Sequence, residues 1–290
     1  MMRTVSPAEM EELPELDRAG FFPAPGETAE EFRKRVRKIR RVFSDFDKEL
    51  RNGTAEFDGL KLSAAGSVPD EFVRDAGEVT EALYGFQIRH VPGFFLSRGV
   101  GLLWGGCMIG DTESGFSLFL IRSTFRKRSR YLVYDRRELF AHELCHAARM
   151  CLGENSRFEE HFAYQTSGSR LRRTFGNCFV RTYDALAFVG GSFLLLLGQI
   201  LRVFLLPSLP IWPFWILALA YPFYLLLRNH AARRILKKAE HALLRHGFSE
   251  PQKVLFRATD REIEQLAAGV PPEQFRDLRW ELIRSRFGQK

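Results

Sequence analysis

Two histidines and a glutamate stand at a spacing that can bind a metal ion and use it. The stretch ELFAHELCHAAR, residues 138–149, contains His142, Glu143 and His146 in the order H-E-x-x-H. On a helix, side chains four residues apart lie on one face, so both imidazoles can bind one zinc ion. Glu143 is rotated ~100° from His142, where its carboxylate can act on a water molecule without joining the ligands. The motif therefore predicts a zinc site in which Glu143 is the catalytic general base.

A hydrolytic zinc site also needs a third protein ligand and one open coordination position. The nearest downstream donors lie in SRFEEHFAYQTS, on a helix predicted over residues 154–166. Glu159 and Glu160 are the two alternatives, and a helical wheel places Glu159 nearer the apolar face of that helix. His161 points away from both glutamates on the same wheel and is not expected to be a ligand.

These residues resemble those of the glutamate-type zinc metallopeptidases, the gluzincins. In that family, H-E-x-x-H is followed by a helix with the pattern E-x-x-A, whose glutamate is the third zinc ligand. Residues 160–163 (EHFA) match the pattern, so the resemblance implies Glu160 as this ligand, with Glu159 as the close alternative. Tyr164 stands where related families carry Asp or Asn, and it is a candidate for supporting a ligand or for donating to an oxyanion.

Residues 138–167 also look like an uncharacterised bacterial family of membrane-associated H-E-x-x-H proteins. The resemblance covers residues 86–182 best and implies a zincin-like fold, a Zn²⁺ cofactor and a peptide or protein substrate. One feature departs from membrane proteases of the CAAX-processing and heat-shock types, which place a membrane hairpin before the ligand glutamate. Here the apolar hairpin follows FEEHFAY, and the rival ligand beyond it is Glu240, in the pattern E-x-A.

The motif helix, predicted over residues 138–152 and ended by Gly153, must pack on other elements. Four short segments rich in aromatic and β-branched residues are separated by Gly, Ser and charged turns, which is typical of strands. They are residues 86–96, 101–109, 116–121 and 131–135. The predicted fold class is therefore α+β, with a small, mostly antiparallel sheet packed on the motif helix and the glutamate helix. In the resemblance, an edge strand pairs with an extended peptide, and 116–121 or 131–135 could be that strand.

The N-terminal part begins with a segment rich in Pro and Glu, residues 1–26, which we interpret as a loose arm. A helix is predicted over residues 28–50, because Thr28 and Glu31 form a capping box and apolar residues recur at helical spacing. Its other face is filled with Arg and Lys, which fits a solvated surface or a face lying on acidic lipid headgroups. A second helix is predicted over residues 68–84.

Two apolar segments follow the predicted site. Residues 185–206 are apolar apart from Gln199 and Arg202, and crossing a bilayer core needs ~20 residues. After the turn PSLP, residues 211–227 are apolar and aromatic. Basic residues flank the pair on both outer sides and the turn has none, so the positive-inside rule predicts a two-helix transmembrane hairpin. Both termini and the catalytic domain would then be cytoplasmic, at a bacterial inner membrane.

The predicted organisation has four parts. They are an N-terminal arm and basic amphipathic helix (1–55), a zincin-like metallopeptidase domain (56–182), the transmembrane hairpin (183–228) and a C-terminal cytoplasmic helical tail (229–290). In the tail, helices are predicted over residues 257–269 and 271–287. The first of them has Thr259 as its N-cap and Glu262 three residues later.

Charge and cysteine content exclude other classes of protein. The chain has 43 basic and 35 acidic residues, a net charge of +8 that suits nucleic acid or an anionic membrane surface. The apolar block favours the membrane, and no RNA-binding motif or DNA-reading helix unit is present, so no nucleic-acid partner is expected. Four cysteines without a C-x-x-C pair fit neither a metal finger nor a disulfide scaffold, and Cys145 is expected to be a core residue.

The predicted function is a membrane-anchored zinc metallopeptidase, an endopeptidase that hydrolyses peptide bonds with a zinc-activated water molecule. Zinc lowers the pKa of its water, and Glu143 takes the proton and passes it to the leaving amine. Tyr131, Tyr134 and Tyr164 are candidate oxyanion donors, and Arg149 and Arg157 are candidates for binding a substrate carboxylate. The alternative is a membrane-anchored scaffold or adaptor with a catalytically silent zincin-like fold.

Overall fold

A three-stranded sheet lies at the centre of the computed structural model, which describes residues 7–97, 101–102, 104–111, 114–153, 157–179 and 181–288. Its strands are β3 (Gly93–Leu96), β5 (Phe116–Arg122) and β4 (Gly106–Asp111), in that order. β5 runs parallel to β3 and antiparallel to β4. Two antiparallel pairs complete the described strands, β1 (Thr54–Phe57) with β2 (Leu60–Ser63) and β6 (Arg130–Tyr131) with β7 (Tyr134–Asp135). The predicted α+β class with small, mostly antiparallel sheets is confirmed.

The side chains of β5 alternate between the two faces of the sheet, and both faces are covered by other elements. Phe119 and Ile121 face α4 (Arg136–Arg149), where the ring centroid of Phe119 lies 6.0 Å from that of Phe140. The other side chains face α2 (Ala29–Arg51) and the β1–β2 pair, and they are Phe116, Leu118 and Leu120. The sheet is thus held between α4 and α2.

Two predicted strands differ from the structure in a way that bears on substrate binding. Residues 116–121 form the central strand β5, whose two edges are both paired, so it cannot pair with a peptide. Residues 131–135 are not one strand: β6 and β7 pair across a tight turn in which Leu132 has a φ of 49°. Residues 116–121 are therefore excluded as a substrate strand, and residues 131–135 are not the single strand that was predicted. Within the described part of the chain, β4 is an edge strand of the three-stranded sheet and lies beside α4.

The other predicted strands are shorter than expected. Of residues 86–96, only β3 joins the sheet, because the backbone N–H of Gln87 donates to the carbonyl oxygen of Arg18 at 2.7 Å instead. Of residues 101–109, the strand begins at Gly106. Three pieces of the predicted elements lie outside the described residues. They are residues 1–6 of the predicted arm, residue 103 of the predicted strand 101–109 and residues 154–156 of the predicted helix 154–166.

Residues 7–18 form a helix, α1 (Pro7–Arg18), rather than part of a loose arm. Leu13 and Leu16 pack in one buried cluster with Phe32 of α2. Asp17 is 1% exposed and accepts hydrogen bonds from Arg257 of α9 (Pro251–Arg257), 240 residues away in the sequence. This buried ion pair holds α1 on the body. The sequence of residues 7–18 does not reveal the contact, because the partner, Arg257, lies at the other end of the chain.

The predicted helices on either side of the site are present. α2 has the capping box of Thr28 and Glu31, and α3 (Asp70–Tyr84) matches the prediction over residues 68–84. Near the C-terminus, α10 (Asp260–Ala267) has its capping box at Thr259, and a short 3₁₀ turn precedes α11 (Leu278–Phe287). One hydrophobic cluster runs through side chains from Phe22 to Phe287, so α3 and the C-terminal helices share the core of the motif helix.

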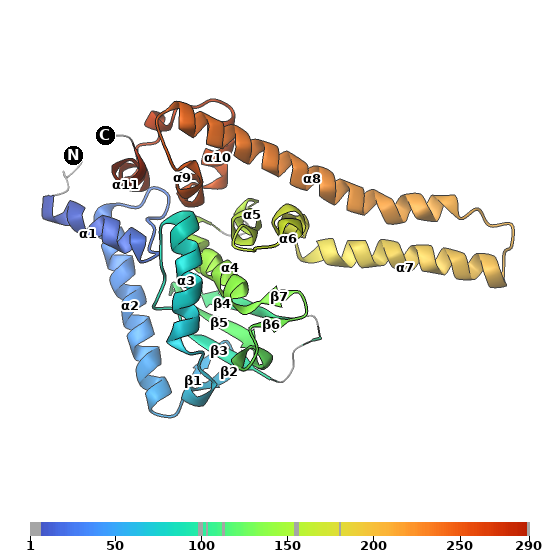
Figure 1. The fold of residues 1–290 in the computed structure, drawn as a ribbon, viewed down its shortest axis with the longest axis horizontal. Coiled ribbons are helices and arrows are strands. Elements are labelled where there is room, and N and C mark those ends of the chain that lie inside the picture. Colours follow the sequence, from blue (N-terminus) through green and yellow to red (C-terminus); the bar gives the residue numbers. More distant parts are fainter. Residues whose placement is uncertain are drawn as a thin grey trace.

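A long helical hairpin extends from this body (Figure 1). Its arms are α7 (Thr182–Phe204) and α8 (Trp212–Arg245), which pack against each other. Within the described residues, one helix is long and apolar enough to cross a membrane, the span 183–204 in α7, and only 6% of its most apolar window is buried. A helix so exposed is not a core helix of the body.

The second predicted span, residues 211–227, does not qualify, and the prediction of a two-helix transmembrane hairpin is corrected accordingly. Trp, Tyr and Pro interrupt this segment, which lowers its hydropathy. It is also no separate element, because α8 continues through the predicted boundary at 228/229 and its C-terminal half packs on α10 in the body. The hairpin therefore contains one span-length apolar helix and one long helix that belongs partly to the core.

A buried carboxylate fixes the base of the hairpin. Asp184, fully buried in the first turn of α7, accepts a hydrogen bond from Arg228 Nη2 at 2.6 Å and one from the Tyr221 hydroxyl at 2.7 Å. Both donors belong to α8. The amide of Asn229 in α8 donates to the carbonyl oxygen of Thr174 at 2.7 Å, so the segment before α7 is fastened as well. The hairpin thus has a defined orientation on the body.

Candidate metal centre

The motif residues lie on α4, whose start is fixed by Asp135. The Asp135 carboxylate accepts hydrogen bonds from the backbone N–H groups of Arg137 and Glu138, as an N-cap does. The helix therefore begins two residues before the predicted position 138. It ends at Arg149, and a 3₁₀ turn carries the chain to Gly153, where φ is 118°. The apolar side of α4 is buried against the sheet, and Cys145 is a core residue as predicted.

The glutamates lie on α5 (Glu159–Tyr164), which is shorter than the helix predicted over residues 154–166. Phe158, Phe162 and Ala163 are buried and turn one side of α5 into the core. The hydroxyl of Tyr84 in α3 donates to the carbonyl oxygen of Phe162 at 2.7 Å. This packing against α3 and α4 turns the two glutamates towards the histidines.

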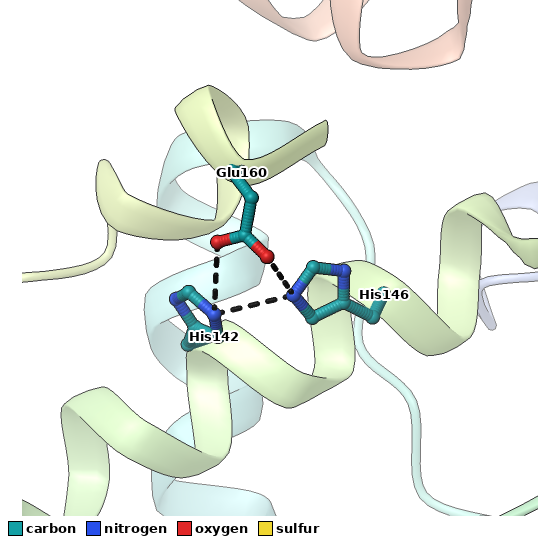
Figure 2. A group of neighbouring side chains, drawn as sticks. All are labelled: His142, His146 and Glu160. Carbon is teal, nitrogen blue, oxygen red and sulfur yellow. Dashed lines mark hydrogen bonds and ion pairs between the residues drawn. The ribbon is translucent and has the colours of Figure 1, made fainter. Parts of the chain in front are cut away.

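His142, His146 and Glu160 converge on one point, and Figure 2 shows their side chains facing one another from α4 and α5. The two Nε2 atoms are 3.2 Å apart. One oxygen of Glu160 lies 3.6 Å from His142 Nε2, and the other lies 3.6 Å from His146 Nε2. Ligand atoms ~2.0–2.2 Å from a tetrahedral zinc ion are separated from one another by roughly 3.3–3.6 Å. With one donor atom from each residue, all three lie within 4.8 Å of one another, so the group could hold a metal ion, and we call it the ligand triangle.

Glu159 occupies a different position. Its Oε1 lies 2.7 Å from Nδ1 of His146, on the side of the ring that faces away from Glu160. A carboxylate at this place keeps the proton on Nδ1 and leaves Nε2 free to bind a metal. Of the two alternatives, the structure thus brings Glu160 into the ligand triangle and places Glu159 behind a ligand histidine.

Glu143 lies beside the ligand triangle, facing β4. Burial raises the pKa of its carboxyl group to about 7, and the nearby Glu160 carboxylate acts in the same direction. His146 and a hydrogen bond with the backbone of Met108 in β4 oppose this rise. A carboxyl group that titrates near neutrality is suited to taking up and returning a proton.

The charges around the histidines suit a bound cation. Burial lowers the pKa of His142 well below its usual value, so this imidazole is neutral, which is the form that binds metals. Burial also acts to lower the pKa of His146, but the Glu159 hydrogen bond and the carboxylates of Glu160 and Glu143 outweigh it and raise the value to about 9. Two imidazoles and one carboxylate are the donor set of several hydrolytic zinc sites, and these residues fit that ion.

Tyr164 stands against the ligand triangle, with its ring centroid 4.7 Å from that of His142. Burial and the Glu160 carboxylate raise the pKa of its hydroxyl to about 12, which keeps it a hydrogen-bond donor. The guanidinium of Arg172 in α6 (Arg170–Phe175) lies 5.9 Å from the centroid of this ring and 5.4 Å from that of Tyr134. Tyr164 and Tyr134 are thus both near the site.

Arg172 was not singled out from the sequence. It is one of three arginines in RLRR, and nothing in that stretch distinguishes it. Its place is set by an ion pair with Glu138 of α4 at 3.2 Å, across 34 residues of sequence. The arginines considered from the sequence were Arg149 and Arg157, whereas the position of Arg172 depends on tertiary contacts.

Other residues considered from the sequence lie elsewhere. Arg149 is buried on the core side of α4 and donates to the backbone of Phe256, and Arg157 forms an ion pair with Glu264 at 3.1 Å. The Tyr131 hydroxyl donates to the carbonyl oxygen of Leu102. Glu240, the rival ligand, lines a separate cavity of about 160 Å³ together with His161. Neither Glu240 nor His161 belongs to the ligand triangle.

Comparisons of the chain with protein-family models, with curated proteins and with solved structures found no match in any of the three. The function must therefore be inferred from the geometry and chemistry of the residues themselves.

Proposed function

We propose that the chain is a membrane-anchored zinc metallopeptidase of the gluzincin type. The observation that carries this proposal is the ligand triangle of His142, His146 and Glu160, whose donor atoms lie close enough together to bind one ion. Three protein ligands leave a fourth position for water or substrate, which is the arrangement of catalytic zinc sites, whereas structural sites use four.

The chemistry follows from the residues around that position. When bound, zinc polarises the substrate carbonyl and makes a water molecule acidic near neutral pH. Glu143 takes the proton of the attacking water and delivers it to the leaving amine. Tyr164, whose hydroxyl stays protonated, is positioned to donate to the oxyanion that forms on the carbonyl oxygen. Glu159 holds His146 in the orientation and protonation that the site requires.

β4 is the strand that we propose to bind the substrate. It is paired with β5 on one side, and its Met108 backbone lies within hydrogen-bonding reach of Glu143. An extended peptide that adds to the other edge of β4 would bring its carbonyl groups past the general base. This pairing recognises the backbone of the substrate, so peptide bonds are the expected target.

The anchor that we propose is α7. Small residues let α8 approach it closely: a Cβ atom on Gly198 would lie 2.7 Å from the Phe214 ring, and one on Gly191 would lie 3.4 Å from Ala218. The basic residues at the base of the hairpin favour a cytoplasmic position for the body, because positively charged segments stay on that side of the membrane.

Removal of zinc tests the proposed function. The full chain is purified in detergent, treated with a chelator and assayed against a peptide library before and after zinc is returned. We expect cleavage to disappear on chelation and to return with about one zinc ion per chain. Stoichiometric zinc without cleavage would favour the silent scaffold, and failure to bind zinc at all would contradict the metal site.

A further inference from the structure

Exposed apolar side chains gather where the helical hairpin leaves the body. They belong to the β6–β7 turn, to α6 and to the segment before α7. Their exposed fractions are 57% for Leu132, 72% for Val133, 69% for Leu171, 46% for Phe175 and 48% for Phe179. We call these five residues the apolar rim. In Figure 1 the β6–β7 turn, α6 and the first turn of α7 all lie at the end of the body from which the hairpin extends.

The rim is one connected structure. Arg172 of α6 donates to the carbonyl oxygen of Val133 at 3.3 Å, which joins α6 to the β6–β7 turn. Arg228 of α8 donates to the carbonyl oxygen of Cys178 at 2.7 Å, next to Phe179. Because these bonds tie the rim to the hairpin, the rim keeps a fixed position relative to α7.

The rim also adjoins the metal centre. Arg172, which holds the β6–β7 turn, is the same arginine that lies beside the rings of Tyr164 and Tyr134. Tyr164 in turn contacts His142 of the ligand triangle. The side chain of Arg172 therefore contacts both the apolar rim and the tyrosines beside the proposed catalytic site.

The segments that form the rim carry mostly positive charge, and two of their arginines, Arg130 and Arg172, form ion pairs with the adjacent Asp135 and Glu138. Residues 122–134 and 165–183 supply the rim, and neither contains Asp or Glu. Their basic residues are Arg122, Arg126, Lys127, Arg128, Arg130, Arg170, Arg172, Arg173 and Arg181. Apolar tips among basic side chains match the interface of an anionic bilayer, where apolar groups enter the headgroup region and cations contact lipid phosphates.

A bilayer suits this surface better than a protein partner does, because the rim is continuous with α7. The apolar span begins at Tyr183, shortly after Phe179. If α7 crosses a membrane, the surface of that membrane lies at the level of the rim. In Figure 1, α2 lies on the side of the body away from the hairpin, so the rim and α2 are well separated.

We propose that the apolar rim docks into the headgroup region of an anionic bilayer and that the metal centre takes its substrates from the membrane surface. The substrate class is then extended peptide segments held close to the bilayer, such as those that adjoin a membrane anchor. The substrate part rests on the proposed peptidase function, whereas the docking of the rim does not.

Lipid-specific quenching tests the docking by itself. A single environment-sensitive fluorophore is attached at Val133→Cys in the full chain, with Cys107 and Cys151 replaced by Ser, in nanodiscs containing phosphatidylglycerol. The matched control carries the label at Lys48→Cys, an exposed position on α2. Lipids brominated near the headgroup are expected to quench the label at position 133 and not at position 48. Absence of quenching at position 133 would overturn the docking and leave the rim to a protein partner.

The substrate class is tested with one peptide in two forms, free in solution and tethered to lipid. The double variant Leu132→Glu, Val133→Glu should slow cleavage of the tethered form by roughly tenfold and leave the free form unchanged, because it removes apolar docking contacts. An equal effect on both forms would contradict a membrane-surface substrate. Quenching at position 133 without cleavage of either form would uphold the docking and contradict the proposed peptidase.

Discussion

The variant Glu143→Gln is expected to cleave peptides roughly 100- to 10,000-fold more slowly than the native chain while it binds zinc normally. The amide has nearly the shape of the carboxylate but cannot accept the proton of water. Glu143 lies beside the ligand triangle and is not part of it, so the ion should keep its three protein ligands. Initial rates on one peptide, with zinc content measured on the same samples, provide the test.

A surface glutamate gives the matched control for this variant. Glu78 of α3 forms an ion pair with Arg137 of α4, and both side chains are more than half exposed. Glu78→Gln removes the same charge near the same helix without touching the site, and we expect its rate to equal that of the native chain. Equal rates in Glu143→Gln and the native chain would exclude Glu143 as the general base.

The second prediction with a large expected effect concerns the zinc affinity of variants at the two adjacent glutamates, Glu159 and Glu160. Glu160→Gln should weaken zinc binding by more than about 100-fold, because a neutral amide replaces the anionic ligand. Glu159→Gln should weaken it by only about 10- to 100-fold, since the amide oxygen can still accept a hydrogen bond from the Nδ1–H group of His146. Competition titrations against a chromogenic chelator measure both affinities.

Each glutamate variant serves as the control for the other, because the substitution is identical and the positions are neighbours. A larger loss in Glu159→Gln than in Glu160→Gln would reverse the assignment. The variant His146→Ala should lose zinc as severely as Glu160→Gln, since both remove a member of the ligand triangle.

Local sequence spacing was enough to predict the arrangement of His142, Glu143 and His146. Their relative positions depend on the geometry of one helix, whose start is marked in the sequence by the N-cap Asp135. The choice between Glu159 and Glu160 was harder for a physical reason. The helical wheel assumed a regular helix over residues 154–166, whereas α5 begins at Glu159 and is oriented by its packing against α3 and α4.

Features that depend on distant pairings were not predictable in the same way. The order β3-β5-β4 makes β4 an edge strand and β5 the central one, whereas the sequence had offered 116–121 or 131–135 as the edge strand. α1 is held by the ion pair of Asp17 with Arg257, and Arg172 is held by Glu138. In each case the partner is far away in the sequence, and neither residue alone indicates the contact.

The most direct test of the zinc centre is X-ray absorption at the zinc edge of the purified full chain. We expect two imidazole nitrogens at ~2.0–2.1 Å, carboxylate and water oxygens at ~2.0–2.2 Å, and no sulfur. Burial and the nearby Glu143 carboxylate raise the pKa of the Cys107 thiol in β4, so this thiol lies near the site and the absence of sulfur distinguishes the ligand triangle from a site that includes it. A sulfur neighbour at ~2.3 Å, or a shell without two imidazoles, would contradict a centre built from His142, His146 and Glu160.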